Sequence, residues 1–268
     1  MEVKGKDFIA FIKEIAMEAG EYIYQSINMI LDIDFKGAND MVTDVDRRSQ
    51  KLITERIIAS FPDHNITSEE QLNRDKNSMF RWIIDPLDGT TNFVHGYPCF
   101  CISIALEYKG KTIAGAVYNP CSREMFFAAD GYGAYLNDRS INVSKAKNLE
   151  TSLLATGFSY AMREGGYLLE EYLKVFCCML NSCQGIRRNG AAALDLCFVA
   201  CGRLDGFFEE GLKEWDVAAG NLIIYEAGGI VTDFNGEKIC RDSKTFVASN
   251  MLIHKELQNI TSCFNMMS

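Results

Sequence analysis

The order of apolar segments changes near residue 150, and this change limits the available folds more than any other feature. Before it, apolar runs at residues 99–108, 112–118 and 124–128 are separated only by turns such as Lys109-Gly110. Runs joined so closely predict an antiparallel meander. After it, β-type runs alternate with helical periodicity, which implies crossover connections and a second sheet covered by helices.

The second half is expected to contain alternating strands and helices. The strands are predicted at residues 153–156, 185–188, 206–209 and 230–234, and the helices at 167–180, 191–201 and 215–227. In the first half, apolar residues recur at three- and four-residue steps from Phe8 to Ile27, which marks an amphipathic helix, and a second helix is expected at about 46–60. The predicted class is therefore α/β (α+β), with two sheets and helices on and between their faces.

Domain organisation follows from the absence of a linker. No segment rich in Gly, Pro, Ser or charge divides the sequence, and no repeat occurs. We therefore predict a single domain over residues 1–268. Its two halves are about 1–148, with the N-terminal helices and the antiparallel sheet, and about 149–268, with the alternating elements.

The composition disfavours several functional classes. With 27 Lys and Arg against 36 Asp and Glu, the net charge of −9 disfavours binding to nucleic acid or to an anionic membrane, and we expect neither partner. The longest strongly apolar run, residues 99–106, is too short to span a bilayer. The first twenty residues are interrupted by charges and lack the apolar region of a signal peptide. We therefore expect a cytoplasmic protein whose ten cysteines are reduced thiols.

The sequence DPLDGTTN, which starts at Asp85, carries the most chemical information. A buried strand is predicted to end at Asp85, Pro86 removes a ladder donor, and Asp88 follows, so two carboxylates can converge beyond the strand. The backbone N–H groups of Gly89 and Thr90 are candidates for an anion-binding turn. Carboxylates beside an anion site make chemical sense with a divalent cation between them. Taken alone, however, Asp88-Gly89 is better explained as an ordinary turn.

Further acidic residues favour a cation site. Glu69-Glu70 follows an expected strand, and Asp44 and Asp46 open the second helix. Asp216 stands where a later helix should begin, and on local sequence alone a capping role is at least as good an explanation. Small residues at 218–220 let this helix end approach other backbone closely. Hard oxygen ligands of this kind suit Mg²⁺ or Mn²⁺ rather than zinc.

Two motifs resemble the signatures of the inositol monophosphatase family, part of a wider lithium-sensitive, magnesium-dependent phosphatase superfamily. They are DPLDGTTNFVHGYP at residues 85–98 and WDVAAG at 215–220. The resemblance continues through Lys36, DMVTDVD at 40–46, Glu69-Glu70, RNGAA at 188–192 and EAGG at 226–229. A long match with a second motif far along the chain is much more specific than a lone Asp-Gly pair. The resemblance implies a layered α-β-α-β-α sandwich of the inositol monophosphatase and fructose 1,6-bisphosphatase type.

The resemblance also implies a metal site. Two or three Mg²⁺ ions, for which Mn²⁺ could substitute, would be bound by Glu69, Asp85, the backbone carbonyl of Leu87, Asp88 and Asp216. Thr90 with Glu69 would orient and help deprotonate a metal-bound water. Asp46 matches an outer carboxylate that supports this arrangement.

Substrate contacts are implied in the same way. The backbone N–H groups of Gly89 and Thr90 would hold the phosphate, and Asp88 would be shared between metal and substrate, as would Asp216. The positions that match contacts to the hydroxylated leaving group are Gly190, Ala192 and Glu209. The expected partner is a small phosphorylated polyol or sugar. The family resemblance and the frequency of dimers among oligomers together point to a homodimer.

The leading functional hypothesis is hydrolysis of inositol monophosphate to inositol and phosphate by metal-activated water. Paired cations suit this reaction because they generate a nucleophile and stabilise the leaving oxygen. One alternative is a fructose-1,6-bisphosphatase or another small sugar or nucleotide phosphatase of the same superfamily. A less favoured alternative, from another class, is a regulatory binding protein that retains the fold. The loop at residues 157–166 would face the substrate in this family, but its sequence does not distinguish these substrates.

Overall fold

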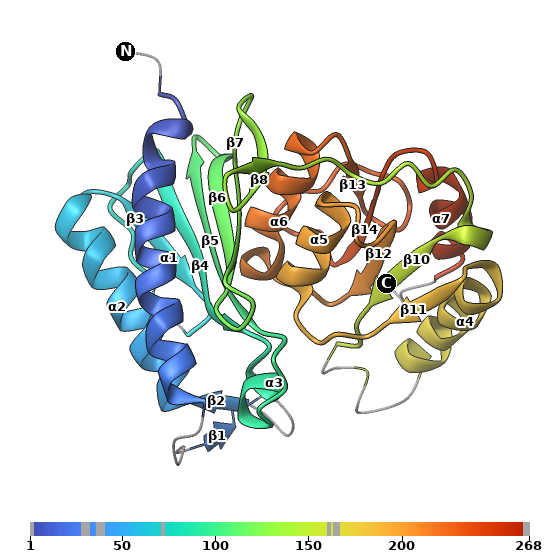
Figure 1. The fold of residues 1–268 in the computed structure, drawn as a ribbon, viewed down its shortest axis with the longest axis horizontal. Coiled ribbons are helices and arrows are strands. Elements are labelled where there is room, and N and C mark those ends of the chain that lie inside the picture. The colour runs from blue at the N-terminus through green and yellow to red at the C-terminus, as the bar shows by residue number, and fades with distance from the viewer. Residues whose placement is uncertain are drawn as a thin grey trace.

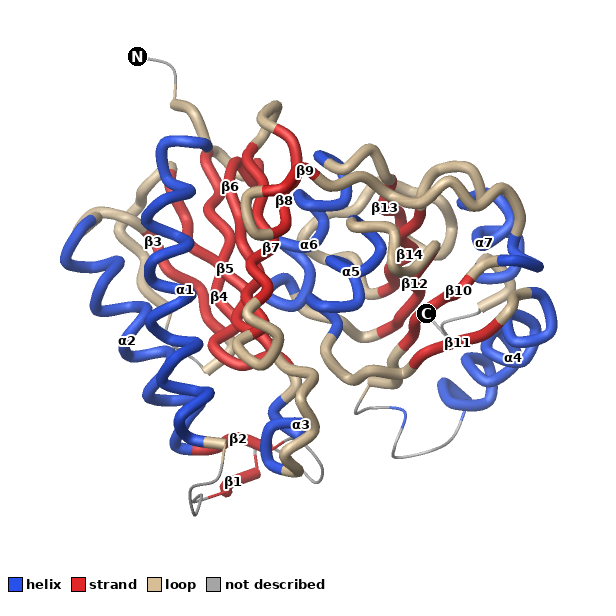
Figure 2. The backbone as a smooth tube through the Cα atoms, viewed as in Figure 1, coloured by secondary structure: helices blue, strands red, loops and turns tan. Residues whose placement is uncertain are grey.

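A computed structural model gives the fold of residues 3–27, 33–35, 41–70, 73–159, 162 and 167–264. For these residues, Figure 1 shows a larger and a smaller β-sheet with helices between them and on both outer faces. Figure 2 shows the same layers by secondary structure. The predicted α-β-α-β-α arrangement of an α/β (α+β) chain is therefore confirmed.

The larger sheet is an almost wholly antiparallel meander, as predicted. Its strands, in spatial order, are β3 (Asn65–Ser68), β4 (Phe80–Asp88), β5 (Cys101–Tyr108), β6 (Lys111–Asn119), β7 (Glu124–Ala129), β8 (Gly133–Leu136) and β9 (Arg139–Ser140). β3 pairs with β4 in parallel, and the later pairs are antiparallel. The register of β4 against β5 shifts between Asp85 and Asp88. The sequence analysis predicted that this strand ends at Asp85. It instead continues to Asp88, past Pro86, which lacks an N–H donor.

Helices α1 (Lys6–Ser26) and α2 (Asp44–Ser60) cover the outer face of this sheet (Figure 1). Ile12, Ile15 and Ala19 of α1 are buried at the predicted helical spacing. The start of α2 is capped by Thr43, whose hydroxyl accepts backbone N–H bonds. The short antiparallel pair β1 (Ile33–Phe35) and β2 (Met41–Thr43) and the short helix α3 (Thr90–Val94) were not predicted.

The smaller sheet is mixed. Its strand order is β11 (Gly185–Arg187), β10 (Leu153–Thr156), β12 (Gly206–Glu210), β14 (Thr245–Ser249) and β13 (Ile230–Thr232), and a 3₁₀ turn at Leu149–Thr151 precedes it. β10 is parallel to β11 and β12, which confirms the expected crossover connections. β14 is antiparallel to both of its neighbours. This strand was not predicted, and it separates β12 from β13.

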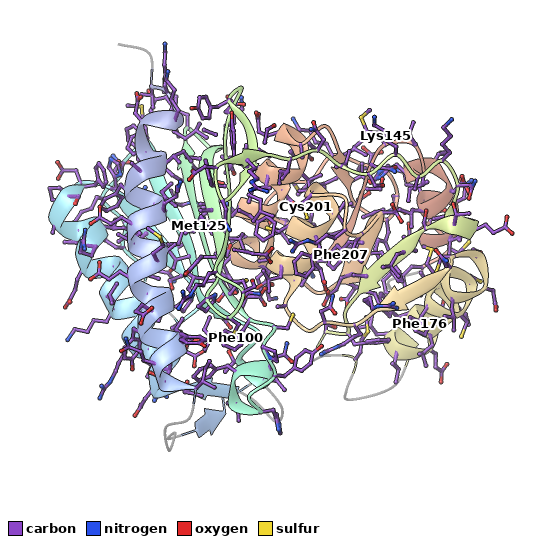
Figure 3. The ribbon with its side chains drawn as sticks, in the orientation of Figure 1. Phe100, Met125, Lys145, Phe176, Cys201 and Phe207 are labelled. Atoms are coloured by element: carbon purple, nitrogen blue, oxygen red, sulfur yellow. The ribbon has the colours of Figure 1, made fainter. Side chains whose placement is uncertain are left out.

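The middle layer consists of α5 (Ala192–Ala200) and α6 (Glu214–Glu226), while α4 (Tyr167–Ser182) and the unpredicted α7 (His254–Thr261) cover the far face of the smaller sheet (Figure 1). Small residues allow this close packing: a Cβ on Gly115 of β6 would lie 3.1 Å from Ala219 of α6. Cys201 and Phe207, labelled in Figure 3, belong to the apolar cluster that the middle layer shares with both sheets. Among the described residues, we find no helix with the length and apolarity needed to cross a membrane.

An aromatic cluster joins α1 and α2 to the larger sheet. Trp82 of β4 is fully buried, and its ring centroid lies between 5.6 and 6.4 Å from those of Phe8, Phe11 and Phe61. The indole N–H of Trp82 donates to Nδ1 of His64 at 3.0 Å. This cluster anchors the strand that leads into the acidic segment at its other end.

His254 of α7 gives the smaller sheet a pH-dependent stability. Its buried ring lies between the hydroxyls of Thr232 and Ser249, which are 3.0 and 2.8 Å from its two nitrogens. Burial lowers the pKa of His254 from 6.5 to about 4. Between these values the folded state binds fewer protons than the unfolded state. The stability present above the unfolded pKa is therefore lost as the pH falls toward the folded pKa.

We expect this titration to lower the free energy of unfolding by about 2 kcal/mol when the pH is lowered from 7.5 to 5. Urea unfolding of the wild type and of His254→Gln at both pH values measures the effect, because the glutamine amide takes up no proton. The wild type should lose more stability than the variant. An equal loss in both proteins would show that His254 does not cause the pH dependence.

Candidate active site

A cavity of about 260 Å³ lies where the end of β4 meets the starts of α5 and α6 and the end of β12. The predicted site residues in its lining are Glu69, Asp85, Leu87, Asp88, Thr90, Gly190, Ala192, Glu209 and Asp216. The remaining two residues adjoin Thr90. Asp46 is hydrogen-bonded to the Thr90 hydroxyl, and Gly89 precedes Thr90 in the chain. The structure therefore brings together residues from both halves of the sequence.

Glu69, Asp85, Asp88 and Asp216 reach this cavity from different elements. Glu69 follows β3, Asp85 and Asp88 lie on the last part of β4, and Asp216 lies in the first turn of α6. Burial raises the pKa of Asp85 well above its usual range, and the charges of the other three carboxylates raise it further. Burial also raises the pKa of Asp88 to about 7 and that of Asp216 well above its usual range. The cluster therefore concentrates negative charge in a place with little solvent.

Backbone N–H groups fix three of these carboxylates. Asp85 Oδ1 accepts from the Leu87 N–H at 3.0 Å, and Asp88 Oδ2 accepts from the Ala193 N–H at 2.8 Å. Asp216 Oδ2 accepts from the Lys213 N–H at 2.7 Å. Asp216 is the third residue of α6 rather than its N-cap, so its carboxylate reaches back to the start of the helix. Its capping role and its position in the cavity are therefore compatible.

The donor set fits a hard divalent cation. The available ligands are carboxylate oxygens and the carbonyl of Leu87, which Mg²⁺ and Mn²⁺ prefer. The largest causes of the Asp85 pKa shift, burial and the charges of Glu69, Asp88 and Asp216, all raise it, and a cation at this point would relieve that repulsion. Within the described residues, no three His, Cys, Asp or Glu side chains are already gathered as a ligand cluster. Binding would therefore require these side chains to adjust.

Asp46 and Thr90 form a hydrogen-bonded pair beside the carboxylates. Thr90 Oγ1 lies 2.9 Å from Asp46 Oδ1 and 3.1 Å from the carbonyl oxygen of Leu87. The other oxygen of Asp46 accepts from the backbone N–H of Thr43 at 2.8 Å and from its hydroxyl. Burial raises the pKa of Asp46, and the hydrogen bonds from Thr43 and Thr90 oppose this shift. Asp46 therefore contacts Thr90 and lies outside the lining of the cavity.

The residues expected to contact the leaving group, Gly190, Ala192 and Glu209, line the same cavity. Burial raises the pKa of Glu209 well above its usual range. A Cβ at position 157 would lie 2.1 Å from Glu209 Oε1, so any side chain there would displace this carboxylate. Gly190 has a φ of 82°, and a Cβ there would lie 2.7 Å from Arg188 Nη1. Both glycines therefore permit close contact between the backbone and charged side chains.

Asp195 was missed by the sequence analysis. It lies on α5, is 1% exposed, lines the cavity and accepts from Asn189 Nδ2 at 2.6 Å. Burial raises the pKa of Asp195 to about 8. The available signal was a carboxylate within the otherwise apolar run AALDLCFVA of residues 192–200, since a charge at a buried helical position needs a partner.

Gln50 of α2 was also missed, and it supports the turn that carries Glu69. Its Nε2 donates to the carbonyl of Glu70 at 3.1 Å, and its Oε1 accepts from the Glu70 N–H at 3.2 Å and from the Ser68 hydroxyl. Asp44, by contrast, lies away from the cavity and pairs with Arg47 at 3.3 Å. Gln50 therefore fixes the backbone next to Glu69.

Some predicted features cannot be placed. Lys36 and Asp40 lie outside the described residues, as do residues 160, 161 and 163–166 of the loop expected to face the substrate. In the described part of this loop, Phe158 and Ser159 line the cavity. The first part of this loop therefore lies at the cavity.

Comparison with known proteins identifies the family. A sequence model described as the inositol monophosphatase family matches residues 5–263. The chain is 45% identical over 238 residues to Nus factor SuhB of Vibrio cholerae, covering 88% of each chain. It is 44% identical over 247 residues to inositol-1-monophosphatase of Synechocystis sp., covering 91% of this chain and 85% of that one. The solved structure of an inositol monophosphatase from Anabaena (Nostoc) sp. is 37% identical with a TM-score of 0.87, covering 97% of both chains. The chain therefore belongs to the inositol monophosphatase family.

Proposed function

We propose that the protein is a Mg²⁺-dependent phosphomonoesterase that hydrolyses inositol monophosphate to inositol and phosphate. The observation that carries this proposal is the convergence of Glu69, Asp85, Asp88 and Asp216 at one cavity, which Asp195 and Glu209 also line. The first group suits cations that bind phosphate, and the second offers acceptors for hydroxyl groups. A hydroxylated phosphate ester would contact both groups. Membership of the family supports the same activity.

The metal site follows from the same residues. Mg²⁺ would be held by Glu69, Asp85, the Leu87 carbonyl, Asp88 and Asp216. When bound, it would offset the charge of the phosphate, lower the pKa of the attacking water and stabilise the leaving oxygen. Family membership supports metal dependence in general. We propose that two or three ions bind here.

Thr90 and Asp46 would handle the proton of the attacking water. If Thr90 donates its hydroxyl proton to Asp46 Oδ1, its oxygen is free to accept a hydrogen bond from water, and the carboxylate of Glu69, which lines the same cavity, would take up the proton that the water loses. The backbone N–H groups of Gly89 and Thr90 would donate to the phosphate. Glu209, with Gly190 and Ala192, would orient the hydroxylated leaving group. The chain itself therefore supplies orientation and proton handling.

Phosphate release from a panel of substrates tests the proposal. The panel contains inositol 1-phosphate, fructose 1,6-bisphosphate, histidinol phosphate and 3′-phosphoadenosine 5′-phosphate, each with Mg²⁺, with EDTA and with added Li⁺. We expect Mg²⁺-dependent, Li⁺-inhibited release, fastest from inositol 1-phosphate. Fructose 1,6-bisphosphate is the sharpest competitor, because Arg188 and Lys213 line the cavity and could bind a second phosphate. Preference for another substrate would leave the proposed reaction class unchanged. It would replace inositol monophosphate as the proposed substrate.

The second candidate is that this chain is a regulatory binding protein that retains the fold of the family. The name of the Vibrio cholerae relative, Nus factor SuhB, favours it. The presence of Glu69, Asp85, Asp88, Thr90 and Asp216 ranks it below catalysis. If a folded, Mg²⁺-binding preparation releases no phosphate from any substrate in the panel, the hydrolase proposal fails and the regulatory candidate takes precedence.

A further inference from the structure

Arg81, Glu107, Glu214 and Arg241 form a network, called here the Arg81 network. Arg81 Nε donates to Glu107 Oε2 at 2.9 Å, and Nη1 donates to Glu214 Oε1 at 2.8 Å. Nη2 lies 2.8 Å from an oxygen of each glutamate. The side chains of Arg81, Glu107 and Glu214 are only 14%, 13% and 20% exposed. Such a largely buried, forked arrangement holds its partners far more firmly than a surface ion pair.

The network joins the segments that carry the acidic cluster. Arg81 lies on β4, the strand of Asp85 and Asp88, and opposite Glu107 of β5. Its Nη1 also lies 3.4 Å from Thr67 Oγ1 on β3, two residues before Glu69. On the other side, Glu214 opens α6 two residues before Asp216. The guanidinium of Arg81 therefore joins β4, which carries Asp85 and Asp88, to β3, which precedes Glu69, and to α6, which carries Asp216.

This arrangement opposes a specific force. Glu69, Asp85, Asp88 and Asp216 repel one another, and the repulsion pushes α6 away from β3 and β4. The Arg81–Glu214 pair pulls the start of α6 toward the same strands. Arg241 approaches Glu107 and Glu214 at 3.8 and 3.7 Å, so two cations balance two anions. The network can therefore hold the segments together without adding net charge beside the cluster.

We infer that Arg81 is a positioning residue that sets metal affinity by holding Asp216 against the strands that carry Glu69 and Asp85. The inference rests on the proposed function, because it takes these carboxylates as metal ligands. Arg81 lies outside the cavity lining, so it acts through Glu214 and Thr67. Its loss should weaken metal binding more than it slows the metal-saturated reaction.

The test compares Mn²⁺ binding by the full chain with and without the forked contacts of the Arg81 guanidinium. In Arg81→Lys, which keeps the charge but loses the geometry, we expect the Mn²⁺ dissociation constant from titration calorimetry to rise by about 10-fold or more. The Mg²⁺ concentration for half-maximal activity should rise in parallel, with little change in kcat at saturating Mg²⁺. The matched control is Arg203→Lys, since Arg203 also bridges the halves through a forked pair with Glu124 but contacts no ligand-bearing segment.

The outcomes separate the inference from the proposed function. Wild-type Mn²⁺ affinity in Arg81→Lys, or an equal loss in Arg203→Lys, would overturn the positioning role and leave the metal site intact. Failure of the wild type to bind Mn²⁺ would instead overturn the metal site itself. If Arg81→Lys does not fold, Glu214→Gln tests the same contact from α6 and should weaken Mn²⁺ binding similarly. Unchanged affinity there would again contradict the inference.

Discussion

Asp216→Asn should lower kcat with inositol 1-phosphate on the order of 10³-fold, the scale on which single charges stabilise phosphoryl-transfer transition states. The asparagine oxygen can still accept the hydrogen bond from the Lys213 N–H, so α6 should start as before. The negative charge that repels Asp88 and Glu69 disappears, however. The variant should therefore unfold at the same temperature as the metal-free wild type or at a higher one, while losing activity.

Steady-state kinetics and thermal unfolding in EDTA check both parts of this result. Asp233→Asn is the matched control, because Asp233 also accepts backbone N–H bonds, from Asn235 and Glu237, but lies outside the cavity lining. It should leave kcat unchanged. Near-normal turnover in Asp216→Asn would remove Asp216 from the metal site, and a large loss of helical circular dichroism would assign it a structural role instead.

Trp82→Ala should produce the largest loss of stability, about 3–5 kcal/mol in the free energy of unfolding. The indole is fully buried among the rings of Phe8, Phe11 and Phe61, and its N–H is bonded to His64. Truncation leaves a cavity between α1, α2 and β4 and leaves the Nδ1 of His64 without this donor.

Urea unfolding at pH 7.5 measures this change, with Trp82→Phe as the graded control. The phenylalanine keeps an aromatic ring in the cluster but has no N–H for His64, so its loss should be clearly smaller than that of alanine. If the two variants lose equal stability, the hydrogen bond to His64 contributes more to the free energy of unfolding than the packing of the ring does. A loss below about 1 kcal/mol for alanine would mean that the cluster repacks around the gap.

The larger sheet could be predicted because its signals are local. Lys109 and Gly110 adopt φ values of 52° and 77° in the turn between β5 and β6, and the flanking apolar runs are long. The carboxylates could be predicted for a related reason, because Asp85 and Asp88 follow a buried run closely in sequence. Resemblance to the family then connected them with Asp216.

Other features depend on contacts that the sequence does not reveal. Residues 245–249 of β14 are all buried, so they lack the alternation that marks a half-exposed strand. Asp195 is distinguished from a solvent-facing helical carboxylate only by its burial against the cavity. Arg81 looks like an ordinary charged residue until α6 brings Glu214 to it from 133 positions away. In each case the information lies in tertiary packing.

The position of β14 has a consequence for biosynthesis. It lies between β12 and β13, although both precede it in the sequence. The larger sheet is complete by Ser140 and can form early in translation, since amino-terminal units generally fold first. The smaller sheet cannot close until residues 245–249 leave the ribosome, and until then the inner edges of β12 and β13 stay unpaired. A ribosome paused before this segment would expose these edges to chaperones or to neighbouring nascent chains.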